Sequence, residues 1–206
     1  MTFTKEVWTT RDIDLLSESI NRYETINGEL LVTIAPSWPH QSICVAICSE
    51  LRIWSRKSDL GRPISGAGFV FSDVDNIIPD LIWINNDRLK ACEDSKGHFT
   101  EAPELVVEVI SARGEKRDAE VKLKLYSSAG VREYWIVDRF LEQVQVYRRE
   151  EGKLALIITL LKADFLHLHF CPIFLTRFLK YSARVGNGNI ANSKSSYSML
   201  LSIYER

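Results

Sequence analysis

The sequence predicts an α/β (α+β) fold, in which helices flank a mixed central β-sheet and an N-terminal helix and β-hairpin precede it. Three observations predict this class. The 206 residues are 46% hydrophobic and 26% charged, which is an ordinary globular composition and enough to bury one full core. Segments with helical spacing alternate with β-prone runs along the chain. The run at 105–110 is nearly all β-branched, as expected for a strand buried on both faces.

The first sixty residues predict a helix, a hairpin and a second helix. Apolar residues at helical spacing over 11–21 follow a capping threonine. Two short β-prone runs, 23–26 and 30–34, flank Asn27-Gly28, the pair most typical of a two-residue hairpin turn. After a proline-containing break, one apolar stripe over 40–56 indicates a helix that faces the core.

The chain from there to residue 161 predicts further strands and helices. The glycine-containing segment 61–78 predicts one or two strands, and a short helix is expected at 87–92. The strand at 105–110 is followed by a helix over 116–128, which ends before Gly130, a natural helix C-cap. The other expected strands are 81–84, 133–138, 143–147 and 154–161.

Residues 1–165 are expected to form one domain, and residues 166–206 an atypical, loose C-terminal tail. The segment 185–198 is rich in Gly, Asn and Ser and has little to bury. The charge balance changes as well: residues 1–147 carry 17 basic and 23 acidic side chains, whereas residues 148–206 carry nine and four. A shifted reading frame near residue 160 would explain both changes.

The composition excludes several classes of protein. With 26 Lys and Arg against 27 Asp and Glu, the chain does not resemble proteins that depend on non-specific attraction to phosphates. Charged residues interrupt the N-terminus and the most apolar stretch, 154–179, so neither a signal peptide nor a membrane span is expected. The four cysteines form no CxxC pair and are interpreted as core or surface thiols. We therefore expect a cytoplasmic protein with no membrane partner.

Two carboxylates within apolar strands are the strongest chemical signal. Glu108 lies inside Leu-Val-Val-Glu-Val-Ile, and a buried unpaired charge is costly, so it requires a cation. Asp80 has the same character, because it stands between Pro79 and an apolar strand. Two carboxylates on neighbouring strands could share a hard cation such as Mg²⁺. The alternative is a turn-capping aspartate and a glutamate in an internal salt bridge.

Lys122 is the candidate cation from the helix that follows. At about 100° per residue, it lies near the apolar stripe of that helix, whereas Lys124 points well away from it. An inward lysine beside paired carboxylates could orient an attacking water or stabilise charge on a phosphate. The alternative is a surface lysine paired with Asp118, four residues earlier.

Six segments of the chain follow one another in a characteristic order. They are Tyr23–Leu30, Pro36–Gln41, Pro79–Leu81, Glu104–Ser111, Asp118–Tyr126 and Gly130–Asp138. This series, which spans roughly residues 10–160, resembles the Uma2 family (DUF820). That family is common in cyanobacteria and is related to the PD-(D/E)XK restriction-endonuclease-like nucleases.

The resemblance implies a restriction-endonuclease-like core and a Mg²⁺-dependent endonuclease that hydrolyses phosphodiester bonds of nucleic acid, with Mn²⁺ as an alternative cofactor. It implies Asp80 and Glu108 as metal ligands and catalytic residues, and Glu29 as a further acidic residue that completes or tunes the metal shell. The family pattern places a lysine two residues after the glutamate, where this chain has Ile110. Lys122 is the implied substitute and would position the attacking water.

Other residues are accessory candidates. His40 matches a family position and could touch the phosphate or shuttle a proton, although such a histidine is also typical of a helix start. Asp118 is expected to be a partner of Lys122 rather than a ligand. A basic cluster near Glu108 could meet phosphates of the nucleic acid, or could be a solvated face. This cluster consists of Arg113, Lys116 and Arg117. His167 and His169 are too few ligands for a zinc site.

Three functions remain open on the sequence alone. We favour an enzyme, a metal-dependent endonuclease that acts on DNA rather than RNA. Restriction-like folds often pair to cut both strands, so a homodimer is also an expectation. The alternative is a catalytically weak or inactive nuclease-fold module that binds nucleic acid or protein. The third is a small-molecule or structural domain, in which Asp80 and Glu108 form an internal ion-pair network.

Overall fold

The structure is a computed structural model, and it describes residues 6–16, 21–33, 35–110 and 116–161. The expected C-terminal tail, 166–206, lies outside the described residues, as do Arg113, His167 and His169.

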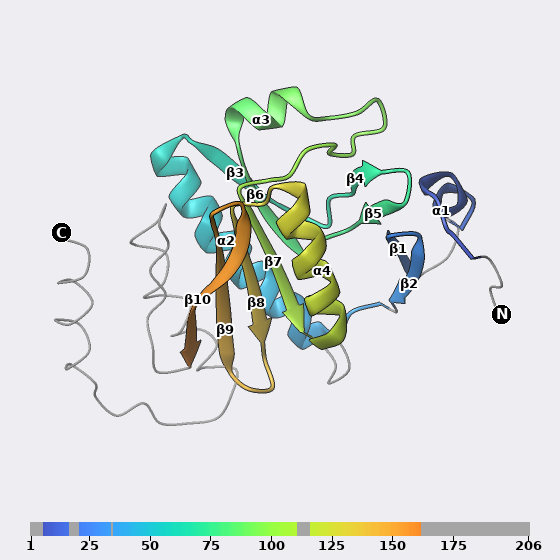
Figure 1. The fold of residues 1–206 in the computed structure, drawn as a ribbon. Coiled ribbons are helices and arrows are strands. Elements are labelled where there is room, and N and C mark those ends of the chain that lie inside the picture. The colour runs from blue at the N-terminus through green and yellow to red at the C-terminus, as the bar shows by residue number, and fades with distance from the viewer. Residues whose placement is uncertain (1–5, 17–20, 34, 111–115, 162–206) are drawn as a thin grey trace, which may run out of the picture.

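Six strands form a mixed central sheet in the order β10-β9-β8-β7-β6-β3 (Figure 1). Its central pair, β7 (Leu105–Ile110) and β8 (Glu133–Asp138), runs parallel, and the other neighbouring pairs are antiparallel. The other strands of this sheet are β3 (Gly61–Ser65), β6 (Leu81–Asn85), β9 (Gln143–Glu150) and β10 (Lys153–Leu161). Every residue of β7 is buried, which confirms the strand predicted from its apolar run.

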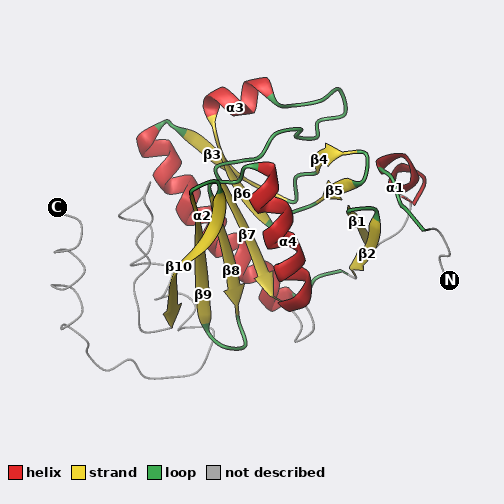
Figure 2. Ribbon diagram, viewed as in Figure 1, coloured by secondary structure: helices red, strands yellow, loops and turns green. Residues whose placement is uncertain are grey.

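Helices α2 (Trp38–Ser58) and α4 (Lys116–Ala129) cover opposite faces of this sheet (Figure 2). Side chains alternate between the two faces along each strand. Val107 and Val109 pack in the cluster that contains the buried face of α2. Val106 and Ile110 pack in the cluster that contains the buried face of α4. Residue 108 of the same strand therefore belongs to the α4 face.

The helix predicted over 40–56 is longer than expected, because α2 already begins at Trp38. Pro39 occupies its first turn, where a missing N–H breaks no helical hydrogen bond. Asp59 caps the end of the helix: it adopts a left-handed conformation with φ 53°, and its N–H donates a hydrogen bond to the Ser55 carbonyl.

The hairpin predicted at Asn27-Gly28 belongs to a second, four-stranded antiparallel sheet, in the order β2-β1-β5-β4. Its strands are β1 (Arg22–Ile26), β2 (Glu29–Thr33), β4 (Phe69–Ser72) and β5 (Asp75–Ile77). Asn27 and Gly28 have φ values of 52° and 77°, which confirms the turn. The segment 61–78 holds three strands rather than one or two, and they belong to different sheets. Short glycine-separated runs show that strands exist but not which sheet each one joins.

Two short helices complete the described chain. α1 (Thr10–Leu16) is the start of the helix predicted over 11–21, and residues 17–20 are not described. α3 (Asn86–Ala91) lies close to the expected position, and the Asn85 side chain caps it by accepting a hydrogen bond from the Arg88 N–H. Among the helices of the described residues, none is long and apolar enough to cross a membrane.

Candidate active site

Asp80 directly precedes β6, and Glu108 lies on the neighbouring strand β7 of the central sheet. In the antiparallel β6–β7 pair Leu81 faces Val107, so the register continued by one residue puts Asp80 opposite Glu108. The Val109 N–H donates a hydrogen bond of 2.9 Å to Asp80 Oδ2, which fixes the Asp80 carboxylate against the edge of β7. The sheet thus brings together the two carboxylates that the sequence suggested.

Glu108 faces α4 and is held there by two side chains. Lys122 Nζ lies 3.1 Å from Glu108 Oε1, and the Tyr126 hydroxyl donates a hydrogen bond of 2.7 Å to the same oxygen. Both bonds use Oε1, so among the described residues Oε2 is the oxygen left for a ligand. Burial raises the pKa of Glu108 to about 7; Lys122 opposes this shift, and the charges of Asp80 and Glu24 add to it.

Lys122 connects Glu108 to a second carboxylate, Glu24 of β1. Its Nζ also lies 3.1 Å from Glu24 Oε1, and its side chain is buried. Burial alone would lower the pKa of Lys122, but the charges of Glu108 and Glu24 outweigh it and raise that pKa. Lys124 is exposed, as the helical spacing predicts. The structure therefore favours the inward lysine over the surface ion pair.

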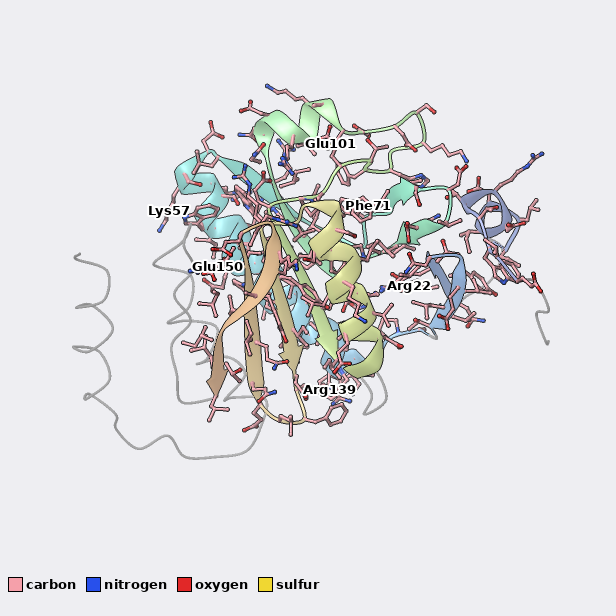
Figure 3. All side chains as sticks on the ribbon, in the orientation of Figure 1. Arg22, Lys57, Phe71, Glu101, Arg139 and Glu150 are labelled. Carbon is pink, nitrogen blue, oxygen red and sulfur yellow. The ribbon has the colours of Figure 1, made fainter. Side chains whose placement is uncertain are left out.

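Two nitrogen-bearing side chains lie close to the other oxygen of Asp80. Arg22 Nη1 donates a hydrogen bond of 3.2 Å to Asp80 Oδ1, and His40 Nε2 lies 3.3 Å from the same atom. Burial alone would raise the pKa of Asp80, but the His40 ring, the Val109 N–H and Arg22 together lower it. Asp80 is therefore ionised at neutral pH. Arg22 lies between the β1–β2 hairpin and α4 (Figure 3).

These side chains line one pocket, where the hairpin, α2, α4 and the ends of β6 and β7 meet. Its carboxylates outnumber its permanently charged cations, Arg22 and Lys122. The acidic members are Glu24, Asp80, Glu108 and Asp118. A surplus of carboxylate oxygens is the donor set that a hard divalent cation requires. Asp80 and Glu108 fit Mg²⁺ or Mn²⁺ on the chemistry of their oxygens.

Glu29, which the resemblance implied as a site residue, lies elsewhere in the structure. It is exposed, it does not line the pocket, and it pairs with Ile26 beside the hairpin turn. Leu31 and Thr33, further along β2, do line the pocket. Four residues of extended strand separate Glu29 from Thr33, a distance of about 13 Å. The expected proximity of Glu29 to Asp80 and Glu108 is therefore not observed.

Glu24 and Arg22 also line the pocket, although the sequence did not single them out. Strand alternation places Arg22, Glu24 and Ile26 on one face of β1, and Ile26 is buried. Glu24 lies opposite Leu31 in the hairpin, so it projects toward the pocket together with Leu31. This alternation, read outward from Ile26, was the signal that could have identified both residues.

The accessory candidates differ in position. His40 and Asp118 both line the pocket. His40 is buried, whereas Asp118 is an exposed residue of the first turn of α4. Lys116 and Arg117 belong to the same turn. Their backbone thus lies in the same turn as Asp118, which lines the pocket.

The mixed sheet and its two covering helices form a restriction-endonuclease-like fold. A sequence model of the Uma2 family, described as "Putative restriction endonuclease", matches residues 11–176. The chain belongs to this family.

A solved structure shares this fold. A crystal structure of a protein from Anabaena variabilis ATCC 29413, described as a putative nuclease belonging to DUF820, superposes with a TM-score of 0.69. It has 16% sequence identity, and the alignment covers 85% of this chain and 99% of the other. The type IIG restriction endonuclease BpuSI gives a TM-score of 0.41 at 14% identity, over 80% of this chain and 18% of its own. No curated protein sequence matches the chain.

Proposed function

We propose that this protein is a divalent-metal-dependent endonuclease that hydrolyses phosphodiester bonds of DNA. One observation carries the proposal: Asp80, which precedes β6, Glu108 of β7 and Lys122 of α4 line a single acidic pocket. Each of these residues is a candidate on sequence grounds alone. The family description and the nuclease-like fold support the same class of reaction.

Asp80 and Glu108 would hold the cation, Mg²⁺ or Mn²⁺. Such an ion, when bound, polarises a phosphate and lowers the pKa of a coordinated water. Lys122 has two roles in this proposal. It opposes the rise in the pKa of Glu108 by lying 3.1 Å from its carboxylate, and it presents an ammonium group to charge that develops on the phosphate.

Arg22 would complete the phosphate side of the pocket. It lines the pocket, and about a quarter of its side chain is exposed. In the structure it donates hydrogen bonds to the Ile78 carbonyl and to Asp80. A metal ion that binds Asp80 would replace Arg22 as the partner of this carboxylate. The Arg22 guanidinium would then be available to bind a phosphate oxygen.

The second candidate function is a binding module on the same fold with little turnover. One observation favours it: both carboxylates already have a cationic partner. Arg22 pairs with Asp80, and Lys122 pairs with Glu108. In this case the pocket would recognise phosphates without cutting them.

Cleavage of supercoiled plasmid, linear duplex and single-stranded DNA, and of RNA, with Mg²⁺ or Mn²⁺ tests the proposal. We expect metal-dependent DNA cleavage by the wild type and a loss of at least about 100-fold in Asp80→Asn, since a catalytic electrostatic interaction is typically worth that much. Glu101→Gln is the matched control, because it removes the same charge from an exposed site outside the pocket. Metal-dependent binding of DNA without cleavage would favour the binding module, and cleavage that survives Asp80→Asn would exclude the proposed site.

A further inference from the structure

Three buried residues with metal-ligating atoms gather behind the pocket, and the proposed cleavage site uses one of them. They are His40, Cys44 and Asp80. One ligand atom from each lies within 4.8 Å of the other two. Their exposed fractions are 4%, 5% and 8%. This is a set of nitrogen, sulfur and oxygen donors, unlike the all-oxygen pair of Asp80 and Glu108.

The fold explains why the three donors meet. His40 and Cys44 are four residues apart on α2, so they lie one turn apart on the same face of that helix. Cys44 packs in the cluster that contains Leu81, the residue after Asp80. Asp80 therefore meets both helical side chains where β6 begins.

His40 provides an independent indication of a ligand. Both of its ring nitrogens are buried, and among the described residues neither has a hydrogen-bond partner. His40 Nε2 lies 3.3 Å from Asp80 Oδ1, close but outside hydrogen-bonding geometry. A buried polar atom without a partner is costly, and such atoms in a native protein usually mark a functional or ligand-binding group.

We propose that His40, Cys44 and Asp80 form a second metal site, selective for a borderline-soft divalent cation such as Zn²⁺. Imidazole, thiolate and carboxylate are the three zinc ligands of proteins, whereas Mg²⁺ takes oxygen ligands. His40 and Asp80 also line the pocket, so a fourth position would open toward it. Binding transfers the Cys44 thiol proton to solvent, because the ligand must be a thiolate.

The shared aspartate gives this site a consequence for the proposed nuclease. A zinc ion held by Asp80 withdraws that carboxylate from the Asp80–Glu108 pair, so zinc would inhibit Mg²⁺-dependent cleavage. This consequence rests on the proposed function, whereas zinc binding itself does not.

Titration of the full-length protein with Co²⁺, an optical substitute for zinc, tests the site directly. We expect one equivalent to bind with a thiolate-to-cobalt charge-transfer band, and one equivalent of Zn²⁺ to abolish the band. Millimolar Mg²⁺ should leave it unchanged. The matched pair of variants is Cys44→Ser, which should lose the band, and Cys48→Ser, one turn further along α2, which should keep it.

Two further variants keep the test decisive. His40→Gln should weaken Co²⁺ binding and alter the absorption of the bound ion, even if Cys44→Ser does not fold. Glu108→Gln should keep the band, because Glu108 belongs to the other pair, and this separates the zinc site from the proposed nuclease site. No charge-transfer band in the wild type, or a band that survives in folded Cys44→Ser, would overturn the proposal.

Discussion

At the scale of single residues, the pocket is defined by an imbalance of buried charge. Lys122 lies between Glu24 and Glu108, and Arg22 lies against Asp80. Removing one partner from a buried charge network leaves the others uncompensated in a poorly solvated site, which is strongly destabilising. The stability of the protein should therefore depend on the same side chains as its proposed chemistry.

Lys122→Met tests this dependence. We expect a loss of about 3–5 kcal/mol in the free energy of unfolding at pH 8, because Glu24 and Glu108 stay buried without their cation. Lys124→Met, two residues away on the exposed face of α4, should change it by about 0.5 kcal/mol or less. Urea denaturation monitored by tryptophan fluorescence measures both. A loss equal to that of Lys124→Met would mean that Lys122 is not a structural counter-ion.

Glu108 predicts a specific dependence of stability on pH. Its pKa rises from an ordinary 4.5 to about 7 in the folded state, so between these values the folded protein binds more protons than the unfolded chain. The free energy of unfolding therefore falls as pH rises through this window, by at most about 1.4 kcal/mol per pH unit for one group. The pKa of Asp80 is lowered instead, so its contribution to stability is lost only as the pH falls below its ordinary value.

The comparison with Glu108→Gln isolates this contribution. In metal-free protein, the wild-type stability minus that of the variant should decline between pH 5 and about 7, as expected for one carboxyl of raised pKa. Thermal unfolding in matched buffers measures the difference. A difference that is flat with pH would show that Glu108 is ionised throughout this range.

Much of the site could be predicted from single residues. Asp80 and Glu108 stand out because each interrupts an apolar strand, and the helical phase of Lys122 distinguishes it from Lys124. Glu29 was selected by analogy rather than by face and distance, and the structure places it near the hairpin turn. Glu24 was not predicted, although the alternation of β1 outward from the buried Ile26 places it on the same face.

At the scale of elements, α2 is joined to the central sheet by a polar contact as well as by apolar packing. Trp83 of β6 donates a hydrogen bond of 2.8 Å from Nε1 to Ser55 Oγ. The Ser55 hydroxyl in turn donates to the Leu51 carbonyl at 2.7 Å. Ser55 is buried, so this chain of hydrogen bonds satisfies an indole N–H inside the core.

Ser55→Ala should therefore lower the free energy of unfolding more than a typical serine substitution does. The Trp83 N–H would remain buried without a partner, a loss of about 1–3 kcal/mol. Ser58→Ala, near the end of the same helix and only half-buried, should cost about 0.5 kcal/mol or less. Chemical denaturation compares the two. Equal effects would indicate that water or a shifted ring replaces the lost hydrogen bond.

The sequence indicated elements better than it indicated pairings. Helix α4 and the neighbouring strands β7 and β8 agree with their predicted ranges. The spacing of apolar residues and the glycine after the helix are local signals, which the sequence shows directly. The division of 61–78 among two sheets was not predictable, because it depends on β5 meeting β1 through the single pair Thr25–Asn76. Such contacts between distant segments leave no periodic pattern.

At the scale of the whole molecule, the mixed α/β class and its restriction-endonuclease-like core are confirmed, whereas the domain boundary stays a prediction. The sequence places that boundary at residue 165, and the family match extends to residue 176. A homodimer also stays a prediction.

Limited proteolysis separates the two boundaries. If the tail begins where composition predicts, mass spectrometry should find a stable fragment that ends near residue 165. A fragment that ends beyond residue 176 would agree with the family match instead and would argue against a shifted reading frame near residue 160. Light scattering on the same samples gives the mass of the assembly and tests the homodimer.

The lysine of this pocket is supplied by a helix rather than by the strand that carries Glu108, and this couples the proposed chemistry to local unfolding. If α4 frays or detaches for a moment, Lys122 and Tyr126 leave together, and Glu108 loses both groups that hold it. Opening would also expose Glu108 to water, so its pKa would fall from about 7 toward its ordinary value and a bound proton would be released. The rate of amide hydrogen exchange in α4 would therefore report how long the pocket stays assembled, and conditions that quicken this exchange would inactivate the protein well before it unfolds.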